Sequence, residues 1–402
     1  MTSNSTLTTS PTSATATLGN QEGTRYDNAR LVIAYTPALD GLRGIAIILV
    51  LFHHFTILKP VAAVDHALAD LALAGWSGVD LFFVLSGFLI TGILIDARGS
   101  DRYFTSFYAR RTLRIFPLYY LIVFLSLVVL PRLPTWFDLL AGAGAPREQW
   151  QYWLYLTNFA VASRDAFRHG VLDVTWSLAI EEQFYLIWAA IVWLCPPRVL
   201  GILCGLTLLV APLARTLALL QGAEPIDVYV LTQYRADALA TGALLAWLLR
   251  RGWLEKQGRT GLALAAMALT GVIAICWAEG SGWWATLWMQ RAGYSLLSLT
   301  GAGMLVAAVV QPQTAVWPRM LSVGWLRAFG KYSYCLYLIH LPVMRVVRAF
   351  VLAPEDFATF GSVLAGQLVF YAAATVPAFA LAWLSWKVFE GPILRLKSRF
   401  PY

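Results

Sequence analysis

The sequence predicts an all-α membrane protein, a bundle of about ten transmembrane helices with both termini in the cytoplasm. Of its 402 residues, 59% are hydrophobic and 13% are charged, whereas average globular chains carry about 25% charged residues. Apolar runs of roughly 20 residues, the length that crosses a bilayer as a helix, recur along the chain. Lys and Arg collect in alternate connections between these runs, which is the pattern that orients membrane proteins.

The apolar runs define the predicted spans. Some contain Gly or polar residues, which transmembrane helices tolerate where they pack against one another. The predicted spans are residues 37–58, 76–95, 112–130, 176–195, 199–220, 234–250, 261–278, 292–310, 332–351 and 363–386.

Cationic residues predict the orientation of the bundle. The outer connections are poor in Lys and Arg if the N-terminus is cytoplasmic, with Arg345 and Arg348 as exceptions. The net charge of +8 follows largely from this bias, so we expect no nucleic-acid partner. The inner connections and the C-terminal tail then carry Arg98, Arg102, Arg110, Arg111, Arg114, Arg198, Arg250, Arg251, Lys256, Arg259, Arg319, Arg327, Lys331, Arg395, Lys397 and Arg399.

The distribution of apolar, charged and Ser or Thr residues divides the chain into three predicted regions. Residues 1–34 are predicted to be a disordered cytoplasmic tail, because the first 20 residues contain eleven Ser or Thr and no Lys or Arg. Such a segment has neither the basic start nor the apolar centre of a signal peptide. Residues 35–390 form the transmembrane domain, and residues 391–402 form a basic cytoplasmic tail.

The longest connection, residues 131–175, is too rich in Pro, Gly and Asp to span the membrane as a whole. We expect an outer loop with a surface-lying piece around Gln149–Phe159, where Trp and Tyr suit the membrane interface.

Several site types are not indicated by the sequence. The four cysteines lie in apolar runs without paired spacing, which argues against a disulfide framework and against a zinc site. There is no P-loop and no Gly-rich dinucleotide motif. We therefore expect no metal and no tightly bound cofactor. The cysteines are Cys195, Cys204, Cys276 and Cys335.

The first span contains an unusual group of ionisable residues. Such groups are costly at membrane depth and usually mark a functional site. At about 100° per residue, Asp40, Arg43 and His54 fall within roughly 60° of one another on one helix face, whereas His53 lies about 100° from His54. The structural alternative is an arginine that extends its charge to the membrane surface and a histidine that is hydrogen-bonded between helices. This alternative is stronger for His53 than for His54.

Further acids and histidines are expected at the depth of His54. The predicted helix directions place Asp80, the Glu181–Glu182 pair and His340 in the outer half of the membrane or past its middle. A histidine beside a carboxylate can accept a hydroxyl proton near neutral pH. Interhelical hydrogen bonding, a proton relay or, for Asp80, a helix cap would explain the same residues without catalysis.

An arginine pair is expected on the opposite, inner side. Arg111 and Arg114 are separated by three residues and are therefore adjacent on a helix face. Guanidinium groups match phosphate oxygens in a bidentate manner, so the pair could hold a phosphorylated co-substrate arriving from the cytoplasm. A role as topological anchors is the alternative.

Taken together, these stretches resemble the acyltransferase-3 family of integral-membrane acyltransferases. The resemblance runs in order from about residue 35 to 395. It rests on Leu39-Asp-Gly-Leu-Arg-Gly44 leading to His54, Gly78-Val-Asp-Leu-Phe-Phe-Val-Leu-Ser-Gly-Phe-Leu-Ile90, Arg111-x-x-Arg114 with Ile115 and Pro117, Trp176-Ser-Leu-x-x-Glu-Glu-x-Phe-Tyr185, Arg235-x-Asp237 with Gly242, and Ser333-Tyr-Cys-Leu-Tyr-Leu-Ile-His340.

The resemblance implies the chemistry of the site. The family pattern of Arg or Lys, ten residues and then His selects Arg43 and His54, with His54 as catalytic base. It implies that Arg111 and Arg114 help to bind acyl-CoA, expected to be acetyl-CoA, as co-substrate. We expect Arg43 to act on the co-substrate or the developing charge. Asp40 is a further catalytic candidate, and either Glu181 or Glu182 is expected to orient or tune His54. Other candidates, without an assigned role, are Asp80, His340, Arg235 and Asp237.

The expected protein is an O-acyltransferase of a bacterial inner (plasma) membrane. The expected acceptor is a hydroxyl of a lipid-linked or surface glycan such as lipopolysaccharide, capsule or exopolysaccharide, with glycan-assembly proteins as conceivable partners. The same pattern would allow acylation of a small hydrophobic glycoside such as a macrolide. A proton-coupled transporter or glycolipid flippase is an alternative from another class, although the arginine pair and the lack of an inverted repeat weaken it.

Overall fold

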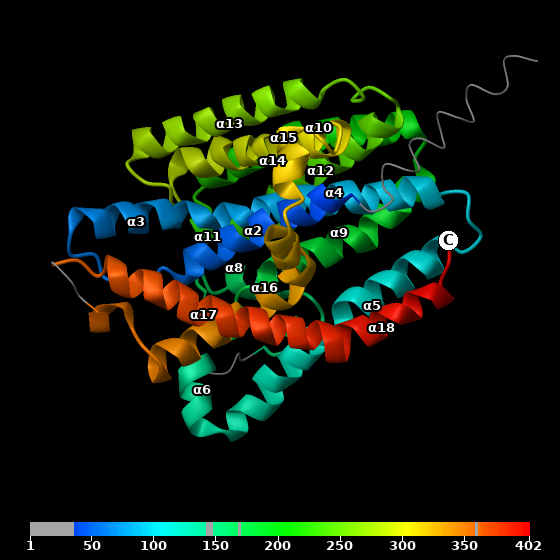
Figure 1. The fold of residues 1–402 in the computed structure, drawn as a ribbon. Helices are drawn as coiled ribbons and strands as arrows, with labels where there is room; N and C mark the ends of the chain where they lie inside the picture. The colour runs from blue at the N-terminus through cyan, green and yellow to red at the C-terminus, as the bar shows by residue number, and fades with distance from the viewer. Residues whose placement is uncertain (1–35, 142–147, 168–169, 358–360) are drawn as a thin grey trace, which may run out of the picture.

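The computed structural model describes residues 36–141, 148–167, 170–357 and 361–402, and the predicted N-terminal tail lies outside them. Every regular element within these ranges is helical, which confirms the all-α prediction (Figure 1). The long helices are α2 (Pro37–Phe55), α4 (Gly78–Ala97), α5 (Tyr103–Phe124), α9 (Thr175–Leu194), α10 (Pro197–Leu220), α12 (Thr232–Arg250), α13 (Gly258–Glu279), α14 (Tyr294–Val310), α16 (Gly324–Phe350) and α17 (Leu364–Ser385).

Short helical pieces extend or connect these helices. Two of them, η2 and η7, are single π-helical turns that continue α5 and α17, and η5 is a third that leads into α14. The short pieces are α3 (Ala63–Leu73), η1 (Ala74–Ser77), η2 (Leu125–Val129), η3 (Leu130–Arg132), α6 (Pro134–Ala141), α7 (Trp150–Trp153), α8 (Thr157–Ala162), η4 (Gly170–Leu172), α11 (Pro225–Val230), η5 (Met289–Gly293), α15 (Val316–Leu321), η6 (Pro354–Phe357), η7 (Trp386–Glu390), α18 (Gly391–Arg395) and η8 (Leu396–Arg399).

Nine helical segments of the described residues are long and apolar enough to cross a membrane. The protein is therefore a multi-pass membrane protein. The predicted span 234–250 is the one without a counterpart among the nine. It corresponds to α12, a helix of 19 residues whose first turns carry Arg235 and Asp237, and these charges lower its mean hydropathy. A total of ten spans and cytoplasmic termini stay predictions.

The centre of the bundle is formed by α2, α4, α12 and α16. Helices α4 and α12 pack closely, because each presents a glycine to the backbone of the other. A Cβ on Gly242 would collide with the carbonyl oxygen of Val84, and a Cβ on Gly87 would collide with that of Leu239. Small residues permit this close approach in membrane bundles, where dispersion contacts hold helices together.

A second close crossing joins α2 to α16. The backbone of α16 meets α2 at Gly330, where a Cβ would collide with the carbonyl oxygen of Asp40. This contact fixes the start of α2, and with it the two charged residues Asp40 and Arg43, against α16. The crossing therefore determines where Arg43 enters the interior of the bundle.

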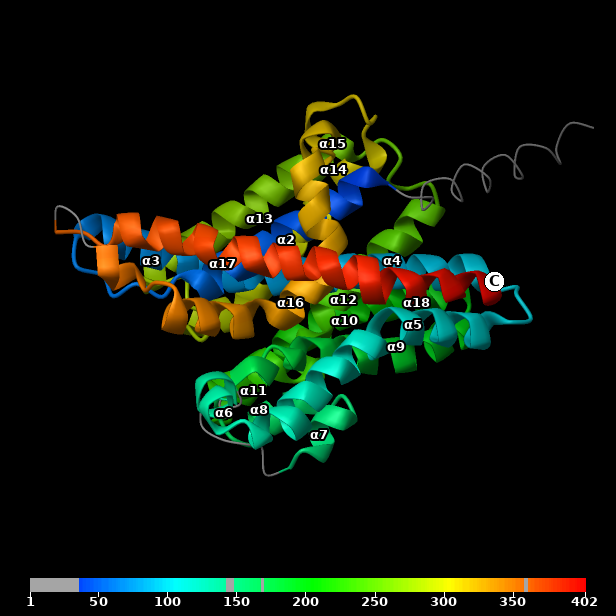
Figure 2. The ribbon, with the colours of Figure 1, turned by 60° about the horizontal axis from the view of Figure 1, so that its bottom comes forward.

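The long connection after α5 does not span the bundle. Its described part contains the short helices α6, α7 and α8, and α8 lies beside α11 (Figure 2). Trp150, Leu154 and Phe159 are exposed, as expected of a surface-lying piece, but Tyr152 is fully buried. The hydroxyl of Tyr119 on α5 donates a hydrogen bond of 2.7 Å to the carbonyl of Tyr152, so this piece is also anchored to the bundle.

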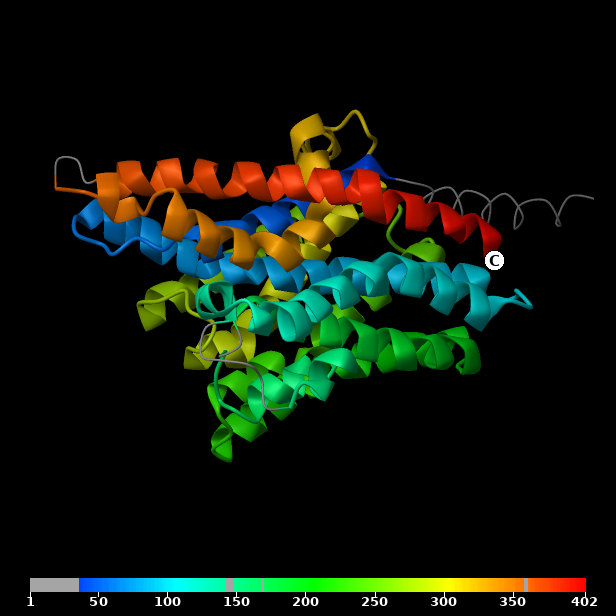
Figure 3. The same cartoon turned by 90° about the horizontal axis from the view of Figure 1, so that it is seen from below.

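The C-terminal helices follow one long path. Helix α17 continues through η7 into α18 and η8, and α18 lies beside α5 (Figure 3). The C-terminus lies next to the first turns of α5, where the hydroxyl of Ser106 donates a hydrogen bond to the carbonyl of Pro401. The basic tail predicted for residues 391–402 thus begins as helix and packs on α5.

We predict that Gly242→Ala destabilises the protein by roughly 1–3 kcal/mol, the usual cost of overpacking. The matched control is Gly205→Ala on α10, where a Cβ would meet no described atom within 4 Å. Both changes improve helix propensity equally, so their difference measures the α4–α12 contact. Thermal unfolding in detergent should show a lower midpoint for Gly242→Ala alone; equal midpoints would contradict the close packing.

Candidate active site

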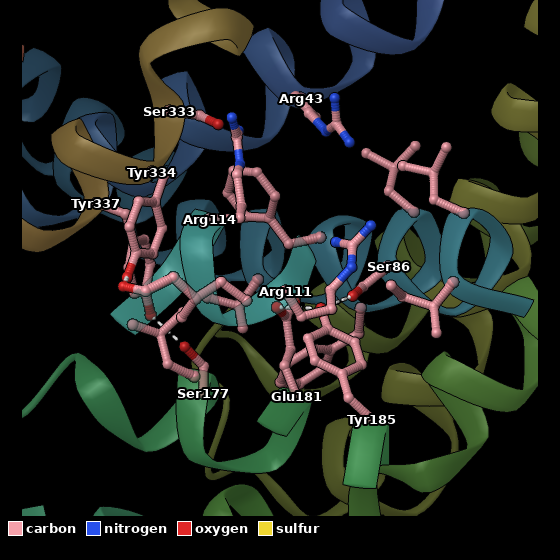
Figure 4. A pocket seen from close by; sticks show the side chains of 18 of the residues that line it. Arg43, Ser86, Arg111, Arg114, Ser177, Glu181, Tyr185, Ser333, Tyr334 and Tyr337 are labelled. Atoms are coloured by element: carbon pink, nitrogen blue, oxygen red, sulfur yellow. Dashed lines mark hydrogen bonds between the residues drawn. The ribbon is translucent and has the colours of Figure 1, made fainter. Parts of the chain in front are cut away.

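A cavity opens between α2, α4, α5, α9 and α16. It encloses about 1000 Å³ of empty space, counted out to its mouth, a size typical of ligand sites. Apolar side chains of α4 line one wall, and charged and hydroxyl groups occupy the others (Figure 4). Its polar lining consists of Arg43, Ser86, Arg111, Arg114, Ser177, Glu181, Tyr185, Ser333, Tyr334 and Tyr337.

Three arginines from two helices enter this cavity. Arg111 and Arg114 come from α5, and Arg43 comes from α2 (Figure 4). The carboxylate of Asp40 accepts a hydrogen bond of 3.1 Å from Arg43, so Asp40 holds this arginine in position. Arg111 and Arg114 form no ion pair with any residue of the described ranges. Two guanidinium groups are therefore available to an anionic ligand.

Glu181 faces the cavity at the arginine end. Its carboxylate accepts a hydrogen bond of 2.8 Å from the Tyr185 hydroxyl, which is itself hydrogen-bonded to Ser86. Arg111 lies over the Tyr185 ring, 6.0 Å from its centroid. The adjacent Glu182 is absent from the cavity lining, and one of its carboxylate oxygens is buried without a hydrogen-bond partner among the described residues. Of the two acids, Glu181 is the one that can act on a bound ligand.

The histidines form a separate cluster at the other end of α2. The rings of His54 and His340 have centroids 4.8 Å apart, and His53 lies 4.9 Å from His54. His53 also contacts Trp283 at 5.9 Å. Carboxylates were predicted at this level from the sequence, but Glu181 lies in the cavity with the arginines instead. None of the described hydrogen bonds or ion pairs joins either glutamate to His54.

Hydrogen bonding assigns the tautomer of each histidine. The Nδ1 atom of His54 lies 3.0 Å from the carbonyl oxygen of Val50, and that of His340 lies 2.8 Å from the carbonyl oxygen of Tyr337. A carbonyl oxygen only accepts, so Nδ1 carries the proton in both rings and Nε2 keeps its lone pair. The same reasoning applies to His53, whose Nδ1 lies 3.0 Å from the carbonyl of Ala72. Nε2 of His54 is thus free to accept a proton.

Tyr337 lies between the cavity and the histidine cluster. Its ring lines the cavity and contacts His340 at 5.9 Å. Its hydroxyl is hydrogen-bonded to Ser177 at 2.6 Å and to the carbonyl of Val174 at 3.0 Å. His54 itself is not a lining residue of the cavity. Arg43 and His54 are separated by eleven residues of one helix, or about 16 Å of helix rise.

Asp80, Arg235 and Asp237 lie outside the cavity in two buried ion pairs. Arg235 binds Asp80 at 2.6 Å, and its guanidinium lies over the Tyr294 ring, 4.1 Å from the centroid. Asp237 receives two hydrogen bonds, of 3.0 and 2.9 Å, from Arg215. These pairs connect α4, α10 and α12. Asp80, expected near the histidines, is instead part of this paired interior.

Several residues that shape the site were not predicted from the sequence. Arg215 could have been found, because it is an arginine within the predicted span 199–220 and ionisable groups at membrane depth are unusual. Ser86, Ser177 and Tyr337 carry no comparable signal. Their hydroxyl groups become informative only when the fold brings them to one cavity.

Comparison with known proteins identifies the family of this chain. The model of the acyltransferase-3 family, described as an acyltransferase domain, matches residues 36–387. The chain is 30% identical over 377 residues to the peptidoglycan O-acetyltransferase OatA of Listeria monocytogenes, covering 89% of this chain and 56% of that protein. It is 27% identical over 330 residues to the O-acetyltransferase OatA of Staphylococcus aureus, covering 79% of this chain and 52% of that protein.

The chain thus spans about half the length of the curated relatives that it matches. No solved structure matches it significantly. The family match covers the cavity, the histidine cluster and both ion pairs. The chain belongs to the acyltransferase-3 family.

Proposed function

We propose that the protein transfers an acyl group, expected to be acetyl, from acyl-CoA to a hydroxyl group of a cell-envelope glycan. The observation that carries the proposal is the cavity with three arginines at one end, in a chain of an acyltransferase family. Arginine forks bind phosphate oxygens, and the nucleotide end of CoA is rich in phosphate. The relatives' names favour peptidoglycan as the acceptor over the lipopolysaccharide or exopolysaccharide expected from the sequence.

In this proposal, Arg111 and Arg114 hold the phosphates, and Arg43, fixed by Asp40, extends the same anion site. A stabilising role for Arg43 at the reacting carbonyl is disfavoured, because helix rise separates it from His54 by about 16 Å. The long pantetheine arm of the co-substrate can cover such a distance. The cavity walls of α4 and α16 lead from the arginines toward Tyr337 and the histidines.

Nε2 of His54 is the proposed general base. It accepts the proton of the acceptor hydroxyl while the hydroxyl oxygen attacks the thioester carbonyl. The new C–O bond forms as the C–S bond breaks, and the thiolate of CoA leaves and takes up a proton. A neutral imidazole with its proton on Nδ1 suits this role, and the hydrogen bond from Nδ1 to the Val50 carbonyl selects that tautomer of the neutral ring. A bacterial plasma membrane is the proposed location.

The rival function is proton-coupled transport. Its support is the cluster of three histidines and the buried Glu182 oxygen without a partner among the described residues. Purified protein incubated with labelled acetyl-CoA and a peptidoglycan fragment as acceptor separates the two functions. Labelling of the acceptor with release of CoA supports acyl transfer, and the absence of both would favour transport.

In this assay we predict that His54→Ala abolishes acyl transfer and that His53→Ala reduces it only in part. His54 contacts His340 and shares a helix face with Arg43, whereas His53 is hydrogen-bonded to Ala72 and contacts Trp283. Protein levels in the membrane serve as the control. Activity that survives in His54→Ala, or equal total loss in both variants, would refute the assignment.

We predict that Arg111→Lys and Arg114→Lys each weaken acyl-CoA binding by about ten- to a hundredfold, since one charge-assisted hydrogen bond is worth roughly 1.5–3 kcal/mol. A lysine keeps the charge but lacks the fork. The matched control is Arg102→Lys at the start of α5, which is exposed and outside the cavity lining. Equilibrium titration with acyl-CoA measures the effect. Unchanged affinity in folded variants would assign the pair to membrane anchoring.

A further inference from the structure

The end of the chain packs on α5, the helix that carries two of the cavity arginines. Residues 396–402 follow α18 and lie along the first turns of α5 (Figure 3). The Arg110 guanidinium donates a hydrogen bond of 3.2 Å to the carbonyl of Phe400 and lies 5.1 Å from the ring centroid of Tyr402. The Ser106 hydroxyl binds the carbonyl of Pro401. These contacts fix the segment to the helix that carries Arg111 and Arg114.

This packing brings Lys397 into the arginine cluster. The ammonium group of Lys397 interacts electrostatically with four guanidinium groups, those of Arg111, Arg114, Arg110 and Arg43. Lys397 is half-buried, although lysine usually keeps its head group in water. Arg110, Arg111 and Arg114 lie on α5, and Lys397 belongs to the C-terminal segment. The cations therefore face one region from different elements.

The positive charge in this region is only partly balanced, because the acids near it are fewer than the five cations. Within the described ranges, Arg43–Asp40 is the only ion pair that includes one of these five cations. Glu390 interacts electrostatically with Arg114, and its carboxylate also accepts a hydrogen bond from Ser385. Glu181 and Glu182 interact electrostatically with Arg111, but neither forms an ion pair with it. Clustered like charges repel one another, more strongly where water is partly excluded. A fold retains such a cluster at lower cost when a polyanion binds there.

We propose that residues 396–402 form one wall of the acyl-CoA entrance, and that Lys397 contacts a phosphate of the nucleotide end opposite Arg111 and Arg114. The proposal rests on the proposed function. CoA carries phosphates at more than one point of its nucleotide end, and two arginines on one helical turn face such a group from one side only. Lys397 supplies the cation on the other side. An anionic lipid head group offers the same chemistry, so the test separates the two ligands.

The experiment titrates CoA into purified protein in a non-ionic detergent. Lys397→Ala should weaken CoA binding by about tenfold, the low end of the range for a charge-assisted contact, and Lys397→Arg should retain affinity. The matched control is Lys387→Ala, which removes the same charge ten residues earlier, where the ammonium lies over the exposed Trp383 ring at 4.2 Å. This control should bind CoA as the parent protein does.

Two further measurements exclude a merely structural role for Lys397. Lys397→Ala should raise the KM for acetyl-CoA and leave turnover of S-acetyl-pantetheine, which lacks phosphate, unchanged. The Lys397→Ala variant should bind phosphatidylglycerol vesicles as strongly as the parent protein does. Unchanged CoA affinity in Lys397→Ala, or a loss confined to the vesicles, overturns the inference and leaves the proposed function intact. A parent protein that does not bind CoA overturns both.

Discussion

The cost of burying charge in an apolar bundle determines the layout of this protein. An unpaired ion in a low-dielectric interior is expensive, and the chain deals with its buried ions in two ways. Arg215 and Arg235 are fully buried and each binds an aspartate across helices. Arg111 and Arg114 lack such partners among the described residues and point into a cavity instead. The paired arginines connect the helices, and the unpaired arginines of the cavity form the proposed ligand site.

Helix α2 couples the two ends of the proposed reaction. It carries Arg43 at the arginine end and His54 in the histidine cluster, and its crossing with α16 at Gly330 fixes both against the helix that carries His340. Because one rigid helix bears both groups, their separation along the axis is set by helix rise, about 16 Å. A co-substrate with charge at one end and the reactive thioester at the other matches this spacing. Tyr337, between cavity and histidines, lies on the path that the thioester would take.

Sequence patterns predicted the parts of the site that lie on one helix. The spacing of Arg43 and His54 and the i, i+3 relation of Arg111 and Arg114 follow from helix geometry alone. Contacts between residues that are far apart in the sequence could not be predicted from helix geometry. Asp80 and Arg235 are 155 positions apart, and no helical period links them, so Asp80 was expected near the histidines. Which glutamate faces the cavity depends on the rotation of α9, and Lys397 joins the arginines only because the chain returns to α5 after α17.

We propose that the arginine end of α2 faces the cytoplasm and the histidine end faces the outer side of the membrane, as the distribution of Lys and Arg predicts. Cysteine labelling in sealed cells tests it most directly, with single cysteines in a background that lacks the four native ones. Asp101→Cys lies in the exposed turn before α5, and Lys59→Cys lies in the exposed loop after α2. An impermeant thiol reagent should label position 59 and spare position 101. Labelling of position 101 alone, or of both positions equally, would contradict the account.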